Sequence, residues 1–291
     1  MTQTELVYLN GDFIPLDEAR ISPLDRGFLF ADGVYEMIPA YAGVLFRLPE
    51  HLQRLTQSLA GIRITNPMDD AQWEAVLSEL IKRNGAGNLA VYLQVTRGAA
   101  GKRDHAFPSI DVPPTVFAMT SPIATPPADS PDTTPGVSAI TLDDTRWARC
   151  DIKSISLLPN ILLRQEAVDR EAAEAIMLRD GFVTEGAASN VFVILDGVII
   201  TPPKSHQILG GITRDLVLEL CRDNGLACDE REINETELRN ASEIWVTSST
   251  REVVPVVTLN RQQVGDGRPG PLWKTLARHY VDFKRQLCGE A

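Results

Sequence analysis

Apolar residues follow two different periods along this chain. A spacing of three or four residues predicts helices, and short apolar or alternating runs predict strands. The expected helices are PEHLQRLTQSLAGI, DDAQWEAVLSELIKRNG, LLPNILLRQEAVDREAA, GITRDLVLELCRDNG and PLWKTLARHYVDFKRQL. The expected strands include VYLNGDFIPL, NLAVYLQVTRG, PPTVFAMTSPI, GVSAITLDD, AEAIMLRDGFVTEG, NVFVILDGVIITPP and EIWVTSS. Helices and strands are mixed without the regular alternation of a doubly wound parallel sheet.

Two dipeptides mark tight turns between strand runs. Asn10-Gly11 and Asp196-Gly197 suit the positive φ angles that a two-residue hairpin turn requires. Hairpins indicate antiparallel pairing, so we expect an α+β fold. The stretch ATPPADSPDTTPG is too rich in proline for a helix or a central strand. We therefore expect a small N-terminal α/β domain over residues 1–123, a linker over 124–135 and a large cofactor-binding domain over 136–291.

Composition narrows the functional class. The chain has 291 residues, and 28 basic against 39 acidic residues give a net charge of −11, which disfavours a nucleic-acid partner. No stretch predicts a membrane span or a signal peptide, and four scattered cysteines suit the reducing cytoplasm. The four histidines show no metal-binding spacing, so we expect no metal. The match of GDGRPG to a dinucleotide fingerprint is interpreted as a turn, because prolines replace helix amides there.

One lysine is a candidate for covalent chemistry. Lys153 is one of six lysines and lies in the mainly apolar stretch CDIKSISLLPN, just before an expected helix. An ordinary lysine with its amine in solvent would fit this position. A lysine in a desolvated pocket can instead form a Schiff base with a carbonyl, and an aldehyde cofactor would then need further partners.

The rest of the chain offers such partners. Glu185 follows a strand run and would either cap a turn or pair with a protonated ring nitrogen. Gly211, Ile212 and Thr213 begin a helix, whose free amides would bind a phosphate or be capped in the ordinary way. Serines at the end of EIWVTSS and an arginine in EHLQRL would add phosphate contacts, although both are also common at ordinary turns and helix surfaces.

At this point the chain resembles the class IV (fold type IV) pyridoxal-phosphate aminotransferases, and among them the bacterial D-amino acid aminotransferases. The resemblance runs in order over nearly the whole length. It comprises DRGFLFADGVYE, EHLQRL, YLQVTRG, RDH, RWARCDIKS, VTEGAASNVF, LGGITRD and VTSSTRE. Each stretch alone is weak, but the ordered set indicates both the fold and the cofactor, pyridoxal 5'-phosphate.

The resemblance implies a role for each matching residue. Lys153 binds the cofactor aldehyde, Glu185 pairs with the pyridine nitrogen and Arg146 contacts the phenolic oxygen. The residues implied to hold the phosphate or pack on the ring are Arg54, Leu209, Gly211, Ile212, Thr213, Ser248 and Ser249. The residues implied to bind substrate are Tyr35, Arg103, His105 and Thr250, with Arg103 and His105 reaching in from the neighbouring subunit of a homodimer.

The implied activity is ping-pong transamination between D-amino acids (D-alanine, D-glutamate, D-aspartate) and 2-oxo acids (2-oxoglutarate, pyruvate). Two features depart from the pattern: the loop GAAGKRDH is one residue longer than expected, and Arg251 stands where a small polar residue is usual. Alternatives on the same fold are a branched-chain L-amino acid aminotransferase and a 4-amino-4-deoxychorismate lyase. A non-enzymatic interaction protein on a decayed scaffold is the alternative of another class.

Overall fold

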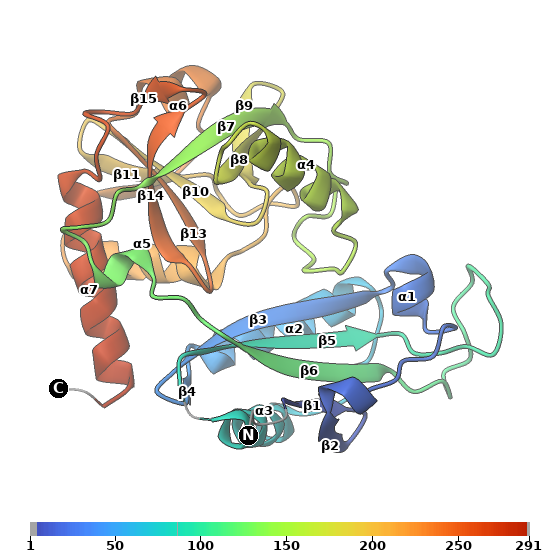
Figure 1. Ribbon diagram of the computed structural model, residues 1–291. Helices are drawn as coiled ribbons and strands as arrows, with labels where there is room; N and C mark the ends of the chain where they lie inside the picture. Colours follow the sequence, from blue (N-terminus) through green and yellow to red (C-terminus); the bar gives the residue numbers. More distant parts are fainter. Residues whose placement is uncertain (1–4, 86, 290–291) are drawn as a thin grey trace. The chain divides into compact units, whose positions relative to one another are not determined.

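The computed structural model describes residues 5–85 and 87–289, which form two compact units (Figure 1). The first unit is Met1–Ile123 together with Ile152–Ser156, and the second is Ala124–Asp151 together with Leu157–Ala291. Residues 152–156 lie inside the stretch expected as the C-terminal domain. They group with the first unit because their backbone bonds to it, as described below.

The first unit is built on an antiparallel sheet of six strands in the order β2-β1-β6-β5-β3-β4. Its strands are β1 (Leu6–Leu9), β2 (Asp12–Pro15), β3 (Gly33–Tyr41), β4 (Val44–Leu45), β5 (Leu89–Thr96) and β6 (Thr115–Pro122). Its helices are the 3-10 turn η1 (Leu16–Glu18), α1 (Arg26–Phe30), α2 (Leu48–Gly61) and α3 (Asp70–Asn84). Asn10 and Gly11 both have positive φ in the β1–β2 turn, which confirms the expected hairpin.

Helices α2 and α3 bury their apolar stripes on one face of this sheet (Figure 1). Leu52, Leu55 and Leu59 of α2 and Trp73 and Leu77 of α3 belong to one buried cluster with alternate residues of β3 and β5. Because successive strand residues point to opposite faces, β3 directs Glu36 toward the helices and the preceding Tyr35 toward the other face.

The second unit contains a nine-stranded mixed sheet, in the order β12-β11-β10-β13-β14-β7-β8-β9 with β15 paired to β14. Its strands are β7 (Val137–Asp143), β8 (Glu174–Arg179), β9 (Phe182–Gly186), β10 (Asn190–Leu195), β11 (Val198–Thr201), β12 (Cys228–Glu230), β13 (Glu243–Ser248), β14 (Glu252–Leu259) and β15 (Gln262–Gln263). Its helices are η2 (Pro127–Asp129), α4 (Leu158–Asp169), α5 (Ile212–Asp223), α6 (Glu235–Asn240) and α7 (Pro271–Leu287). Helices mixed with mainly antiparallel strands confirm the α+β class.

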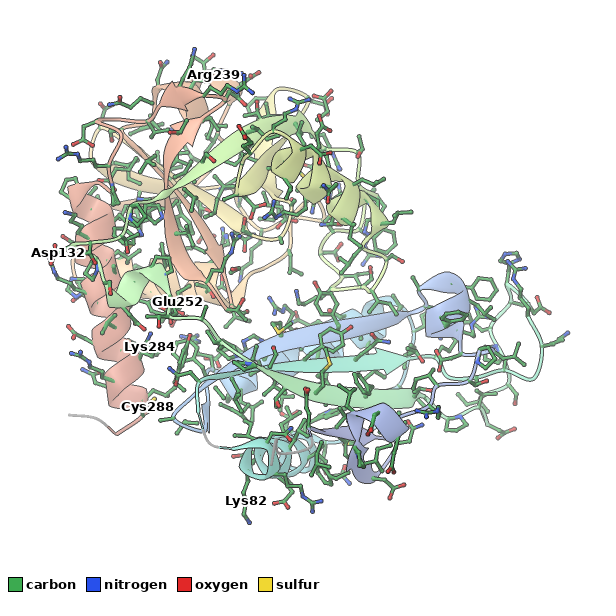
Figure 2. The ribbon with its side chains drawn as sticks, in the orientation of Figure 1. Lys82, Asp132, Arg239, Glu252, Lys284 and Cys288 are labelled. Carbon is green, nitrogen blue, oxygen red and sulfur yellow. The ribbon has the colours of Figure 1, made fainter. Side chains whose placement is uncertain are left out.

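The proline-rich stretch expected as a linker is folded within the second unit. Its 3-10 helix η2 packs on α7, and Ala128 is fully buried. Lys284 of α7 donates to Asp129 of η2 and to Glu252 of β14, the latter at 2.8 Å (Figure 2). Lys284 therefore links the exposed Asp129 of this stretch to the buried Glu252 of β14. Within the described residues, no helix is both long and apolar enough to cross a membrane.

Candidate active site

Lys153 is held at the edge of the first unit's sheet. Its carbonyl accepts the amide of Tyr35 at 3.0 Å, and its own amide donates to the hydroxyl of Ser58 at 3.2 Å. Ser154 forms an isolated antiparallel bridge with Val34. The lysine Nζ lies 4.2 Å from the centroid of the Tyr35 ring. The backbone therefore fixes the lysine, while its amine rests against the π face of a residue implied to bind substrate.

Behind Tyr35, the other face of β3 carries a buried ionic cluster. Glu36 is fully buried and accepts two bonds from Arg54, from Nε at 2.8 Å and from Nη2 at 2.7 Å. His51 Nδ1 lies 2.8 Å from the same carboxylate. Burial alone would raise the pKa of Glu36, but the guanidinium and the imidazole outweigh it and hold that pKa well below its usual range. Arg54, expected at the cofactor phosphate, is thus anchored by a permanent carboxylate.

The structure places Arg103 and His105 away from the sheet, on the exposed loop between β5 and β6. The Arg103 guanidinium lies 4.9 Å from the Phe30 ring centroid, and the His105 ring is 5.2 Å from the same centroid. Both side chains therefore rest on α1.

In the second unit, three residues expected at the cofactor meet. Glu185, on β9, is 4 % exposed; its Oε1 accepts a short bond from Arg146 and its Oε2 accepts the Leu209 amide at 3.0 Å. Asn190 completes this set, because its Nδ2 donates to Glu185 Oε2 at 3.0 Å and to the Leu209 carbonyl at 2.8 Å. Both oxygens of the carboxylate are thus fixed by neighbours from separate elements.

Arg146 forms ion pairs with two carboxylates, those of Glu185 and Asp144. It also forms a two-point pair with Asp144, from Nε and Nη2 at 2.9 Å each, and Asp144 additionally accepts the Thr184 hydroxyl and an ion pair from Arg179. Burial raises the pKa of Glu185 to about 7, against the opposing effect of Arg146 and with a further rise from the nearby charge of Asp144. Glu185 is therefore a buried acid without enough positive charge around it.

Helix α5 begins without a side-chain cap. Gly211 is its N-cap residue, and the amides of Ile212 and Thr213 open the first turn. A Cβ at Gly211 would lie 2.0 Å from Oδ1 of Asn190, so the close approach of this backbone to the Glu185 set requires glycine. An uncapped N-terminus of a twelve-residue helix is a favourable place for a phosphate.

The remaining expected residues lie where β13 turns into β14. Ser248 ends β13, and Ser249 and Thr250 form the half-buried turn that follows. The next residue, Arg251, donates from Nη2 to Glu174 Oε2 at 2.7 Å, and Glu174 is fully buried. The unusual arginine of this turn is thus paired with an acid on β8.

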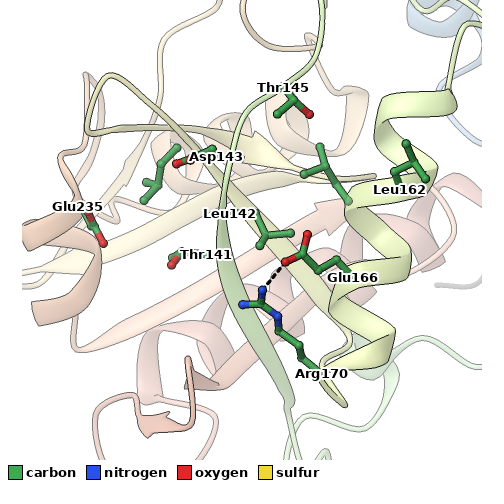
Figure 3. A pocket seen from close by; sticks show the side chains of 10 residues that line it. Thr141, Leu142, Asp143, Thr145, Leu162, Glu166, Arg170 and Glu235 are labelled. Atoms are coloured by element: carbon green, nitrogen blue, oxygen red, sulfur yellow. Dashed lines mark hydrogen bonds and ion pairs between the residues drawn. The ribbon is translucent and has the colours of Figure 1, made fainter.

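A separate groove lies between β7 and α4 of the second unit (Figure 3). It has a volume of about 540 Å³, and an ion pair between Glu166 and Arg170 lies along it. None of the residues implied to bind cofactor or substrate lines it. The described residues also contain no cluster of His, Cys, Asp or Glu able to hold a metal ion.

The sequence reasoning missed four of the residues that build these clusters: Glu36, His51, Asp144 and Asn190. Two of them left a signal in the sequence. Glu36 is a charged residue at a core position of an otherwise apolar strand, and His51 stands three residues before Arg54 on the apolar face of its helix. Asp144 and Asn190 lie at strand ends, where polar residues are ordinary.

Comparison with known proteins identifies the class. The family model "Amino-transferase class IV" matches residues 33–259, so the chain belongs to the class IV aminotransferases, which use pyridoxal 5'-phosphate. The chain is 46% identical over 270 residues to a D-alanine aminotransferase of Bacillus licheniformis, covering 93% of this chain and 94% of that protein. A D-alanine aminotransferase of Listeria monocytogenes is 37% identical, with 98% of each chain covered.

Solved structures show the same fold. A branched-chain aminotransferase of Thermoproteus uzoniensis, solved with norvaline, matches with a TM-score of 0.85 and 26% identity over 99% of this chain and 96% of that one. A hypothetical aminotransferase from Mycobacterium tuberculosis in a PLP-bound form matches with a TM-score of 0.82 and 27% identity, covering 95% of this chain and 97% of that one. The expected fold type IV is confirmed.

The residues present fit this cofactor. A buried carboxylate with a raised pKa is short of one cation, and a protonated pyridine nitrogen is a cation with one N–H to donate. The uncapped start of α5 offers amides to a phosphate.

Proposed function

We propose that the protein is a D-amino acid aminotransferase that exchanges the amino group between D-alanine, D-glutamate or D-aspartate and 2-oxoglutarate or pyruvate. The similarity over nearly the whole chain to proteins named D-alanine aminotransferase carries the proposal. The contact of Lys153 with Tyr35 and the hydrogen bonds that hold Glu185 support it.

We propose that the residues of the candidate site have the following roles toward the cofactor. Lys153 holds the aldehyde carbon, Glu185 accepts the pyridine N–H and Arg146 donates to the phenolic oxygen. The phosphate is bound by Arg54, Gly211, Ile212, Thr213, Ser248 and Ser249, and Leu209 packs on the ring. Pyridoxal phosphate supplies an aldehyde that takes up the amino group and a ring that withdraws electrons from the substrate Cα.

Proton movement then falls to the chain's own groups. The Lys153 amine would act as the general base and acid that takes up and returns the proton of the substrate Cα. Glu185 keeps its partner nitrogen protonated throughout, because a buried carboxylate gains from the adjacent positive charge. Two such half-reactions, one releasing a 2-oxo acid and one consuming another, give ping-pong kinetics.

Handedness rests on the carboxylate contacts. We propose that Tyr35, Arg103 and His105 bind the substrate α-carboxylate, with Arg103 and His105 donated by the second subunit of a homodimer, and that Thr250 also binds substrate. An arginine fork beside a histidine suits a carboxylate. A branched-chain L-amino acid aminotransferase is the second candidate, because solved structures of branched-chain aminotransferases share this fold. Four free cysteines support a cytoplasmic location.

The visible absorption spectrum tests cofactor and handedness together. We expect the band of lysine-bound pyridoxal phosphate to disappear with D-alanine and to persist with L-alanine. Lys153→Ala should abolish the band and lower turnover at least about 10²-fold. Lys82→Ala, whose side chain is 81% exposed, should change neither. Bleaching by L-alanine alone would favour the second candidate, and a wild-type protein that never shows the band would contradict the proposal.

A further inference from the structure

The loop between β5 and β6 is held by a buried arginine that no comparison singles out. Arg26, the first residue of α1, is 5 % exposed. Its Nη1 donates to the Asp104 carbonyl at 2.5 Å and to the Ala106 carbonyl at 3.2 Å, and its Nη2 donates to the His105 carbonyl at 3.3 Å. One guanidinium thus binds three consecutive carbonyls of the stretch that presents Arg103 and His105.

Arg26 is itself fixed by a chain of charged contacts. Its Nε donates to Asp32 Oδ2 at 2.8 Å, and Arg97 donates to both oxygens of Asp32, at 2.8 and 2.9 Å. Arg97 directly follows β5 and is 9 % exposed. Burial would raise the pKa of Asp32, but the two guanidinium groups outweigh it and lower that pKa. A carboxylate that stays charged between two arginines keeps the Arg26 fork in one orientation.

The side chains around this contact share one aromatic ring. The Phe30 ring lies 4.9 Å from the guanidinium carbon of Arg103, 5.2 Å from the His105 ring and 4.9 Å from the guanidinium carbon of Arg26. Phe30 is half-buried, whereas Phe28 of the same helix is 76% exposed. A flat ring that supports two cationic or aromatic side chains limits the directions that they adopt.

We propose that Arg26 and Phe30 are positioning residues for recognition of the substrate carboxylate: Arg26 fixes the loop backbone, and Phe30 sets the directions of Arg103 and His105. This inference rests on the proposed function, which assigns Arg103 and His105 to the carboxylate. Both residues act through Arg103 and His105, which they contact, rather than on the reacting atoms. Their loss therefore weakens substrate binding and leaves the chemistry on Lys153 unchanged.

The test uses the holoenzyme and separates binding from chemistry. In Arg26→Lys, a point charge keeps the ion pair with Asp32 but cannot span three carbonyls, so we expect KM for D-alanine to rise about tenfold with kcat nearly unchanged. Phe30→Leu should raise KM about fivefold, and Phe30→Tyr, which keeps the aromatic face, should restore it. The inhibition constant of propionate, a carboxylate without an amino group, should rise in parallel with KM.

Matched control variants are available in the same unit. Arg20→Lys alters an exposed arginine that donates to the Asp17 and Ala19 carbonyls, and Phe28→Leu alters the exposed ring of α1. Both should behave as wild type. Unchanged KM and propionate inhibition in Arg26→Lys and Phe30→Leu would overturn the positioning role, as would a fall in kcat without a rise in KM. Failure of the proposed function would appear differently, as a wild-type holoenzyme that does not respond to D-alanine.

Discussion

The first unit buries Glu36 beside Arg54 and the second buries Glu185 beside Arg146, and these two pairs behave in opposite ways. Glu36 receives both arms of Arg54 as well as His51, and its pKa lies well below the usual range. Glu185 receives a single arm of Arg146, and its pKa is raised to about 7. Burial raises the pKa of both acids; Arg54 and His51 outweigh it at Glu36, whereas at Glu185 Arg146, which also pairs with Asp144, does not.

The comparison distinguishes a completed ion pair from an incomplete one. Glu36 has the charge it needs from within its own unit, as expected of a group that anchors structure. Glu185 has both oxygens bonded but too little positive charge, so a cationic ligand would stabilise it further. Burial of an acid therefore predicts the direction of its pKa shift only when the other ion pairs of its arginine partner are also known.

The largest effect that separates the two acids should be on activity. Glu185→Gln removes the carboxylate that keeps the pyridine nitrogen protonated, and we expect turnover to fall on the order of 10²- to 10³-fold. Glu36→Gln, measured with D-alanine under the same conditions, should retain activity within about tenfold wherever it is folded. Equal losses of turnover in the two variants would contradict the assignment of different roles to Glu36 and Glu185.

Stability should rank the two variants in the reverse order. Glu36→Gln leaves the Arg54 charge buried without a full partner, which costs roughly 3–5 kcal/mol of unfolding free energy. Glu185→Gln leaves Arg146 paired with Asp144 and should cost far less. Urea unfolding of the cofactor-free proteins at pH 7 measures both. A Glu185→Gln protein less stable than Glu36→Gln would contradict the account.

The smallest expected effect is on the pH dependence of the unfolding free energy, and its sign follows from the two pKa shifts. A folded-state pKa of about 7 for Glu185, against an ordinary value of 4.5, means that the folded protein holds the extra proton between these values. The cofactor-free protein should therefore lose stability as pH rises from 4.5 to about 7, by up to about 3 kcal/mol from this group. For Glu36 the lowered pKa gives stability above its unfolded value of 4.5, lost as pH falls.

Glu185→Gln should flatten the slope between pH 4.5 and 7, and saturating pyridoxal phosphate should do the same in the wild type. The readout is the unfolding free energy from urea titrations at several pH values. If Glu185→Gln kept the wild-type dependence of unfolding free energy on pH, that dependence would have to come from another titrating group.

Much of the fold follows from local pattern, and the exceptions have physical reasons. The turns at Asn10-Gly11 and Asp196-Gly197 follow from turn chemistry, and helices with clear apolar stripes such as α2 and α7 follow from periodicity. Strand β14 escapes notice because Pro255 lies in the middle of it, although proline is unusual inside a sheet. Strand β3 is hard to predict because the charged residue Glu36 occupies a buried position where an apolar residue is expected.

The sequence predicts residues for a candidate site but does not predict how they pair with one another. The ordered motifs predict Lys153, Glu185 and Arg146, yet nothing local indicates that Arg146 is shared with Asp144 or that Asn190 joins Glu185 to Leu209. The grouping of Lys153 with the first unit depends on backbone bonds to Tyr35 and Ser58, which lie about a hundred positions away. Such long-range pairings are decided by tertiary structure and leave no periodic trace.

The short segment Ile152–Ser156 has a consequence for how the chain folds. The chain passes from one unit to the other after Ile123, returns at Ile152 and leaves again after Ser156. A single proteolytic cut cannot release an intact first unit, because a fragment ending at Ile123 lacks the backbone that pairs with Val34 and Tyr35. The amine of Lys153 thus reaches its place only after a loop of 28 residues of the second unit, Ala124–Asp151, has been closed. Closing this loop costs conformational entropy during folding.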